Sequence, residues 1–226
     1  WDSWSRTNLP ADGGGRALRE FEKAYPRLRS RRYDPCSSDI AALVDGAQLV
    51  IAHEWNSPAL IDRLSRMRPR RKGMRLLFHD THHRSVTDRG SMSHYNLRNF
   101  DGVLAFGRVI QRIYQRLGWA RRAWVWHEAA DVRRFSPLPS RKSLGDVVWI
   151  GNWGDEERTA ELHEFLLSPV RHLKLKARIY GVRYPRRALK WLQRSNIEYG
   201  GYLANFDVPR IFKDYSLTVH IPRRPY

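Results

Sequence analysis

The stretch from Asp146 to Gly154, DVVWIGNWG, decides how the rest of the chain is interpreted. Four apolar residues at 147–150 lead into Gly151 and Gly154, and a polar run with a helical pattern follows. This order is typical of a buried strand that enters a tight turn before a helix. Glycines in such a turn let a ligand approach the backbone, and the helix presents unpaired N–H groups to an anion. The stretch therefore predicts the opening of a Rossmann-like unit. An ordinary strand–loop–helix connection is the alternative, because a Gly-x-x-Gly loop alone is a weak signal.

Short apolar runs alternate with helical patterns on both sides of this stretch. Upstream, we expect strands at 48–53, 74–79, 102–106 and 122–127. We also expect helices at 16–25, 59–67 and 109–117. A further short helix is expected to begin with a cap at Ser37 or Ser38 and to end at Val44. Downstream, we expect strands at 147–150, 177–180, 197–199 and 217–221, and helices at 156–167, 187–193 and 208–215. Such alternation predicts βαβ units and parallel sheets.

A proline-containing linker at 138–145 separates the two series of strands. We therefore predict an α/β fold with two Rossmann-like parallel-sheet domains, one at 1–137 and one at 146–226. Polar or glycine-rich loops follow most of the strands, at 53–56, 79–84, 127–128, 151–154, 181–184 and 200–202. Because the carboxyl ends of parallel strands share one edge, where such sheets bind ligands, these loops are expected to converge on a site.

Composition restricts the classes of partner. The 226 residues include 41 basic and 23 acidic side chains, for a formal net charge of +18, with dense basic clusters at 27–32 and 68–72. A positive field favours nucleic acid, anionic lipid headgroups or phosphorylated substrates. The alternative is that the arginines, which are spread along the chain, are merely solvated. The single cysteine, Cys36, excludes an intrachain disulfide, and the absence of an apolar run of about 18 residues excludes a membrane-spanning helix.

The loop at 79–84 offers the clearest candidate for acid–base chemistry. His79 suits a general base, because it stands at a strand end and imidazole titrates near neutral pH. Asp80 is expected to accept a proton from the acceptor or to orient a histidine; the alternative is that Asp80 and Thr81 cap the next turn. His79, His82 and His83 with Asp80 also supply ligand types for zinc. Their spacing matches no standard zinc site, and a loop with one structural histidine is the commoner arrangement.

Arg158 lies in the first turn of the helix expected after the glycine loop. A guanidinium group there is suited to clamp a diphosphate with two hydrogen bonds. A pair with Asp155 or Glu161 on a solvated helix face is the alternative.

Six stretches, taken in order and spacing, resemble a known family. They are LVIAHEW at 49–55, LLFHD at 76–80, EAADVRRFSP at 128–137, VWIGN at 148–152, IYG at 179–181 and IEYGGYL at 197–203. Together they resemble a GT-B glycosyltransferase of the CgeB-like group and, more distantly, the GT4-like enzymes. The resemblance covers most of residues 48–221.

This resemblance implies a hexosyltransferase-like enzyme that moves a sugar from a nucleotide-diphosphate donor to an unidentified acceptor without a metal or other cofactor. The domain at 1–137 is then the acceptor side, and the domain at 146–226 binds the nucleotide sugar. The implied catalytic residues are His79 and Asp80, and the acceptor-side candidates are His53, Glu54, His82 and Glu128. The implied donor-binding residues are Gly151, Asn152, Trp153, Arg158, Tyr180, Gly181, Gly200, Gly201 and Tyr202.

The family's first strand and glycine loop should precede Trp1, and its glutamate-bearing donor segment should follow Tyr226. We therefore expect an internal fragment with two incomplete domains, whose activity by itself is an open question. Two other functions fit the charge. One is a non-catalytic polyanion binder, for which nine tryptophans offer stacking partners for single-stranded nucleic acid. The other is a cytoplasmic enzyme with a basic surface in peripheral contact with anionic lipid at the inner membrane surface. The sequence leaves the sugar, the nucleotide base, the stereochemistry and the oligomeric state undetermined.

Overall fold

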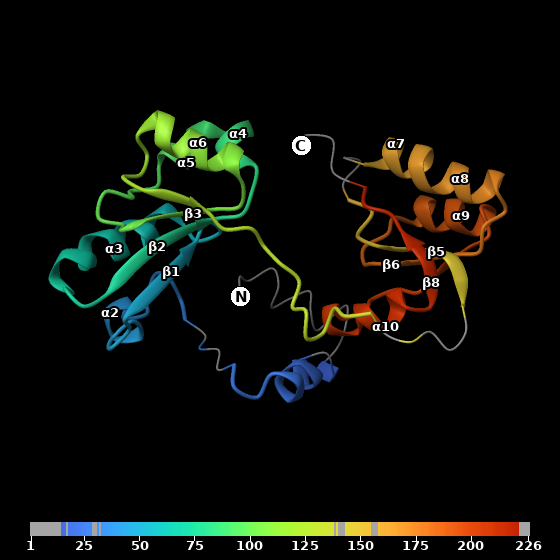
Figure 1. Ribbon diagram of the computed structural model, residues 1–226, viewed down its shortest axis with the longest axis horizontal. Coiled ribbons are helices and arrows are strands. Elements are labelled where there is room, and N and C mark those ends of the chain that lie inside the picture. The colour runs from blue at the N-terminus through green and yellow to red at the C-terminus, as the bar shows by residue number, and fades with distance from the viewer. Residues whose placement is uncertain are drawn as a thin grey trace. The chain divides into compact units, whose positions relative to one another are not determined.

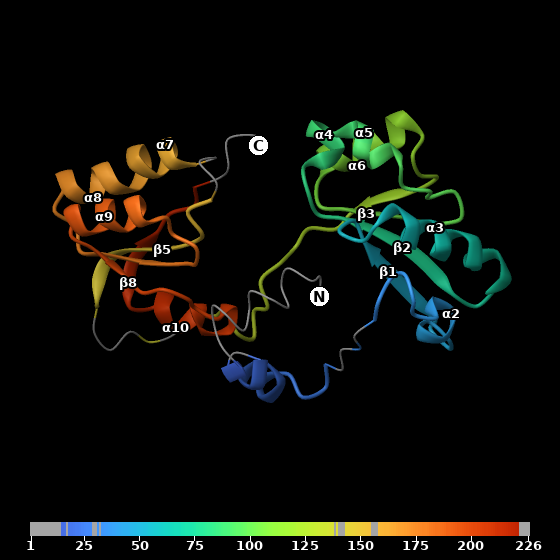
Figure 2. The same cartoon turned by 180° about the vertical axis from the view of Figure 1, so that it is seen from behind.

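The computed structural model describes residues 15–221, apart from 17, 29–30, 32, 138, 140–142 and 155–157. The chain divides into two compact units. The first unit holds residues 32–129, and the second unit joins residues up to 31 with those from 130 onward. Each unit contains a four-stranded parallel sheet, ordered β1-β2-β3-β4 in the first and β7-β6-β5-β8 in the second (Figure 1 and Figure 2). The predicted α/β class with two parallel sheets is confirmed.

The division into units differs from the predicted domain bounds. Residues 130–137 and the described residues up to 31 belong with the second sheet, whereas the sequence groups 1–137 as one domain. Arg134 shows the connection between these segments. Its Nη2 donates a hydrogen bond to the carbonyl of Ala24 at 3.2 Å, and its guanidinium carbon lies 5.1 Å from the ring centre of Tyr25. The helix near the amino end, residues 18–24, therefore packs beside the segment that enters the second sheet.

The first unit contains all the strands predicted for it. They are β1 Leu49–His53, β2 Arg75–Asp80, β3 Gly102–Ala105 and β4 Ala123–Val125. Its helices are α2 Ile40–Leu43, α3 Pro58–Met67, α4 Arg84–Thr87, α5 Arg89–Ser93 and α6 Arg108–Leu117, with a 3-10 turn, η1, at Arg68–Arg70. The sequence does not predict α4 and α5. The predicted cap of α2 is wrong, because Asp39, rather than a serine, accepts the N–H groups of Ala41 and Ala42.

The two long helices of this unit begin and end where local chemistry dictates. The Ser57 side chain accepts the N–H of Leu60 at the start of α3, and Pro58 occupies the first helical position, where its missing N–H is not needed. The α6 helix ends at Gly118, whose φ of 65° is left-handed and costs glycine no steric strain.

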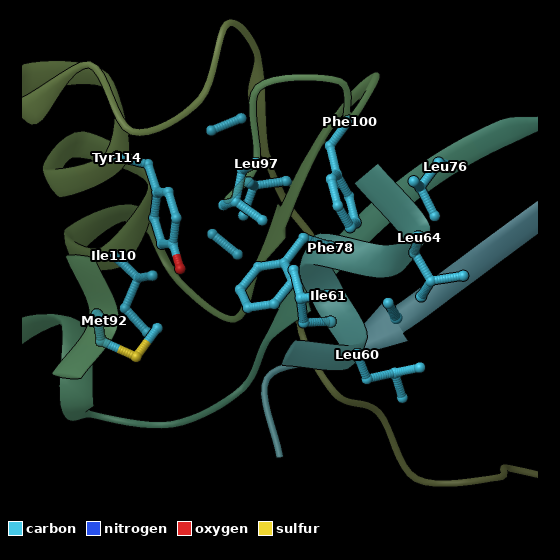
Figure 3. Close-up of a cluster of buried hydrophobic side chains, with 14 of the residues drawn as sticks. Leu60, Ile61, Leu64, Leu76, Phe78, Met92, Leu97, Phe100, Ile110 and Tyr114 are labelled. Carbon is cyan, nitrogen blue, oxygen red and sulfur yellow. The ribbon is translucent and has the colours of Figure 1, made fainter. Parts of the chain in front are cut away.

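The core of the first unit lies between the sheet and its helices (Figure 3). Phe78 of β2 is fully buried, and its ring centre lies 6.1 Å from that of Phe100 and 6.5 Å from that of Tyr114. Alternate strand residues face away from this core, and among them Leu49, Ile51 and Trp124 are exposed. His53 and His79 share that second face of the sheet, because they follow the same alternation.

The second unit repeats the alternation of strands and helices. Its strands are β5 Gly145–Ile150, β6 Ala177–Tyr180, β7 Ile197–Tyr199 and β8 Tyr215–Thr218. Its helices are α7 Thr159–Leu162, α8 Ser168–His172, α9 Arg186–Arg194 and α10 Val208–Phe212, with a 3-10 turn, η3, at Asn205–Asp207. The last strand lies two to three residues earlier than predicted, and α10 ends before the predicted 215. The start of the helix predicted at 156–167 lies partly outside the described residues.

A π-helical turn, η2 at His163–Leu167, joins α7 to α8. Pro169 follows this turn. Proline has no N–H for the carbonyl four residues earlier, and its ring crowds that carbonyl, so a wider turn lets the helix continue beyond the predicted end at 167. No helix in the described part of the chain is long and apolar enough to cross a membrane.

Candidate functional site

Two of the predicted histidines meet at the carboxyl edge of the first sheet. His53 and His79 are register partners on β1 and β2, and their ring centres lie 5.3 Å apart in an edge-to-face arrangement. The ring of Trp126, which directly follows β4, lies 5.0 Å from the ring of His79. Parallel pairing therefore brings three aromatic side chains from distant parts of the sequence to one edge.

The ring of His53 is fixed by hydrogen bonds on both sides. The backbone N–H of Trp55 donates to Nδ1 at 3.3 Å, so Nε2 carries the proton in this arrangement. Nε2 lies 3.1 Å from Oγ1 of Thr81, whose hydroxyl donates to the Glu54 carboxylate at 3.1 Å. Both nitrogens of His53 are engaged, which makes it a positioning residue.

Glu54 is fully buried and forms the base of this network. Nη2 of Arg84 lies 2.6 Å from Oε2 of Glu54 and also donates to the Glu54 carbonyl at 2.8 Å. The Tyr95 hydroxyl donates to the same carbonyl at 2.6 Å. The Glu54 side chain, predicted to face an acceptor, instead lies in a buried ion pair that holds Thr81 and, through it, His53.

His79 is the histidine at this edge that can exchange a proton. Neither of its ring nitrogens has a hydrogen-bond partner among the described residues. Burial lowers the pKa of His79 below its ordinary value, and the His53 ring lowers it further, while Glu128, Glu54 and Asp80 act in the opposite direction. The imidazole is therefore neutral at pH 7 and able to accept a proton.

We expect the Trp126→Ala substitution to raise the titration midpoint of His79 toward the ordinary value of about 6.5, because it exposes the ring to water. In the native protein the midpoint lies below that value. The unfolded chain then takes up the proton first, so His79 makes the fold less stable as pH falls through this interval. Imidazole NMR titration measures both midpoints. The control is Trp124→Ala, which removes an exposed tryptophan within β4; an equal shift in both variants contradicts the assignment.

Asp80 is fully buried at the end of β2. Its Oδ1 accepts the backbone N–H of His82 at 3.1 Å, and its Oδ2 accepts the hydroxyls of Ser85 at 2.6 Å and Tyr114 at 3.0 Å. Burial raises the pKa of Asp80, and these three hydrogen bonds oppose the rise. The carboxylate holds the turn at 81–85, which agrees with the capping alternative and makes Asp80 a positioning residue.

The remaining predicted residues of the first unit lie around this edge. The rings of His82 and His83 are 4.0 Å apart, and Nδ1 of His83 lies 2.6 Å from the Thr87 hydroxyl. Glu128 is exposed, and its charge is one of those that raise the pKa of His79. Within the described ranges, no three His, Cys, Asp or Glu side chains are grouped to hold a metal ion.

In the second unit, three glycine-containing loops are tied together at the carboxyl edge of the sheet. The Tyr184 hydroxyl donates to the Gly151 carbonyl at 2.7 Å, and the N–H of Val182 donates to Oδ1 of Asn152 at 2.9 Å. The N–H of Gly181 donates to the Gly201 carbonyl at 2.8 Å. These hydrogen bonds therefore connect the loops that contain the predicted residues Gly151, Asn152, Gly181 and Gly201.

Close approach explains why glycine occupies two of these positions. A Cβ atom at Gly181 would lie 2.2 Å from the Gly151 carbonyl oxygen, and one at Gly200 would lie 2.4 Å from the Tyr180 ring. Tyr180 itself is buried. These glycines therefore allow the loops to pack against each other, whether or not a ligand binds there.

Trp153 and Arg158 lie differently with respect to these loops. Trp153 is fully buried, with its ring centre 5.8 Å from that of Trp191, so its indole belongs to the core. Arg158 precedes α7 and is partly exposed. Its charge lowers the pKa of Tyr184, although burial and Tyr199 raise that pKa overall. Arg158 is thus close to the hydroxyl that holds Gly151. Tyr202 is also partly exposed, next to Gly201.

The sequence pattern does not single out three residues that shape these edges, namely Arg84, Trp126 and Tyr184, and it indicates Thr81 only as an alternative cap of the turn. Each lies in or beside a strand-end loop that the sequence does indicate. What the sequence does not indicate is which residue of a loop faces which partner.

Comparisons with known proteins bear on the fold. No family model matches the chain, and no curated protein matches its sequence. The crystal structure of TarM matches with a TM-score of 0.54 at 15% identity, over 75% of this chain and 35% of TarM. A structure of an S. aureus TarM mutant with fondaparinux, alpha-GlcNAc-glycerol and UDP gives 0.49 at 15% identity, over 65% of this chain and 32% of that one. Accessory secretory proteins 1, 2 and 3 from Streptococcus pneumoniae give 0.47 at 14% identity, over 94% and 41%.

This chain therefore spans about a third of the length of TarM. At this level of identity the match to TarM concerns the fold alone. Two four-stranded parallel sheets, one in each unit, are consistent with the twin Rossmann-like domains of the GT-B architecture.

Proposed function

We propose that the protein is a glycosyltransferase of the CgeB-like, GT4-like kind, which transfers a sugar from a nucleotide-diphosphate donor to an acceptor hydroxyl. The observation that carries the proposal is the joined set of glycine loops at the carboxyl edge of β5, β6 and β7. In Rossmann-like sheets this edge binds nucleotides. The proposal places the acceptor side in the first unit, residues 32–129, and the donor side in the second unit.

The donor loops suit a diphosphate for two reasons. Asn152 is exposed in the loop after β5, where phosphate oxygens can reach it, and α7 begins at Thr159. Arg158 supplies a guanidinium group beside this turn, and positive groups at that place stabilise the charge that builds on a leaving diphosphate. We assign Gly181, Gly200, Gly201 and Tyr202 to the border of the nucleotide. No metal or cofactor is needed in this mechanism.

His79 supplies the acceptor chemistry. Its neutral imidazole accepts the proton of the acceptor hydroxyl as the hydroxyl oxygen bonds to the anomeric carbon. The bond between that carbon and the phosphate oxygen breaks, and its electron pair leaves with the diphosphate. His53 and Asp80 position this edge, and His82 and Glu128 are the candidates for contact with the acceptor. Because His79 must be neutral, activity is expected to fall as pH drops below its lowered pKa.

The test is calorimetric titration of the chain with UDP-, GDP-, ADP-, CDP- and TDP-sugars. We expect one donor to bind, and Arg158→Ala to weaken its binding roughly 10- to 100-fold, the value of hydrogen bonds to a charged group. Arg171→Ala, which removes an exposed arginine from α8 of the same unit, should leave the affinity nearly unchanged. Binding of no donor, or an equal loss in both variants, would overturn the proposal.

The net charge of +18 supports a second candidate function, in which the protein binds a polyanion without catalysis. Filter binding of single-stranded oligonucleotides across a salt series separates the two. A steep salt dependence with no response to nucleotide sugar favours the polyanion binder. The same basic surface also supports peripheral attachment of a cytoplasmic enzyme to the inner membrane surface, which flotation with anionic vesicles tests.

A further inference from the structure

The first unit contains a cavity of about 350 Å³ at the amino edge of its sheet. This is the edge opposite to His53 and His79, because the lining residues precede or begin the strands. Arg75 begins β2, Asp101 precedes β3, and Arg122 precedes β4. Five arginines and one carboxylate line the cavity: Arg68, Arg75, Arg98, Arg121, Arg122 and Asp101. Its volume lies in the range of small-molecule sites, roughly 300–1,000 Å³.

Asp101 fixes one wall of this cavity. Its carboxylate accepts two hydrogen bonds from Arg68, both at 2.9 Å, one from Arg75 at 3.1 Å and one from the N–H of Leu76 at 2.8 Å. These donors, led by Arg68, hold the pKa of Asp101 well below its usual range. Asp101 therefore stays ionised, and the guanidinium group of Arg68 is kept in one orientation at the cavity wall.

The other three arginines have no such partner. Arg98, Arg121 and Arg122 are exposed, and their side chains make no ion pair or hydrogen bond with any residue in the described part of the chain. Five arginines thus line a cavity that contains one carboxylate. Like charges that converge repel one another, and an anion placed among them removes that repulsion.

Stabilisation of helix ends does not account for this cluster. The α3 and α6 helices end at this edge, and basic side chains often bind the carbonyl groups there. Arg68 donates from Nη1 to the carbonyl of Arg71 at 3.4 Å, just after the 3-10 turn η1 that follows α3. Arg98, Arg121 and Arg122 donate to no carbonyl among the described residues.

We propose that this cavity binds an anion that carries a phosphate group. Planar guanidinium groups match phosphate oxygens with paired hydrogen bonds, and several of them suit a dianion better than a carboxylate. The cavity exceeds the size of a single phosphate, so the ligand is a small phosphorylated molecule or a phosphorylated lipid headgroup. This site is separate from the proposed donor loops and does not depend on them.

The test titrates inorganic pyrophosphate into the chain by calorimetry at constant ionic strength. All measurements use an Arg158→Ala background, so that the proposed donor loops do not contribute. The cavity variant is Arg121→Gln with Arg122→Gln. The matched control is Arg108→Gln with Arg112→Gln, which removes two exposed charges from α6 outside the cavity. We expect binding to weaken at least about tenfold in the cavity variant and less than about twofold in the control.

A second arm identifies the source of the phosphate group. Vesicles of phosphatidic acid in phosphatidylcholine are floated with each variant. If the cavity variant no longer floats with the vesicles and the control still does, the ligand is a lipid headgroup. If pyrophosphate binds but the two variants float equally, the ligand is a soluble phosphate. Circular dichroism melting confirms that both variants fold. The proposal is overturned if neither probe binds, or if both variants lose binding equally, since the general positive charge then explains the result.

Discussion

Replacing Trp153 with alanine is expected to lower the free energy of unfolding of the second unit by about 3–5 kcal/mol. Trp153 is fully buried, and its ring centre lies 5.6 Å from that of Tyr184. Its Nε1 donates a hydrogen bond to the Thr159 hydroxyl at 3.0 Å. The substitution leaves a large cavity and removes the link between the loop after β5 and the start of α7. Hydrogen exchange of peptides from β5 and β6 measures the loss within this unit.

The matched control is Phe165→Ala in the same unit. The Phe165 side chain is 56% exposed, so its removal is expected to change the free energy of unfolding by less than about 1 kcal/mol. Equal losses in the two variants would show that Trp153 is not the centre of this core. Because Tyr184 contacts Trp153 and holds the Gly151 carbonyl, Trp153→Ala is also expected to weaken binding of a donor through the loop.

Trp153 illustrates what a sequence pattern can and cannot predict. The strand at 145–150 is recognisable because a short run of apolar residues before glycine is a local property of the sequence. The direction of a side chain in the following loop depends on tertiary packing. Trp153 was predicted to bind the donor, yet its indole lies inside the core. For the same reason, the parallel alternation predicted the position of His53 and His79 at one edge, but not the ring of Trp126 against His79.

Contacts over long sequence separations account for most of what the sequence does not predict. Arg84 pairs with Glu54 thirty residues away, and nothing in the local pattern of either residue selects the other. The arginines that line the cavity at the amino edge of the first sheet span 68–122, and only the cluster at 68–72 stands out in the sequence. The helix at 18–24 belongs with the second unit, a choice made by packing rather than by order along the chain.

Arg84→Met is expected to destabilise the first unit by about 3–5 kcal/mol, because it leaves the carboxylate of Glu54 buried without its cation. Glu54 is fully buried, and its Oε2 lies 2.6 Å from Nη2 of Arg84. The Thr81 hydroxyl, which also donates to the Glu54 carboxylate, is neutral and cannot replace the charge. Urea denaturation followed by hydrogen exchange of β1 and β2 peptides measures the loss. The exposed pair of Arg66 with Asp62 on α3, at 2.8 Å, is the control; Arg66→Met should cost less than about 0.5 kcal/mol.

A double variant, Glu54→Leu with Arg84→Met, separates two contributions to the free energy of unfolding. One is the cost of a buried carboxylate without a cation, and the other is the stabilisation by the ion pair itself. Replacement of a buried ion pair by apolar side chains of similar volume is often neutral, so the double variant is expected to recover most of the stability that Arg84→Met loses. The Thr81 hydroxyl then loses its acceptor at Glu54 while its oxygen stays beside Nε2 of His53, so recovery of stability should come with a change in the His53 imidazole NMR signals. If the double variant is as unstable as Arg84→Met, the pair stabilises the fold by direct attraction, and the explanation by desolvation of Glu54 is wrong.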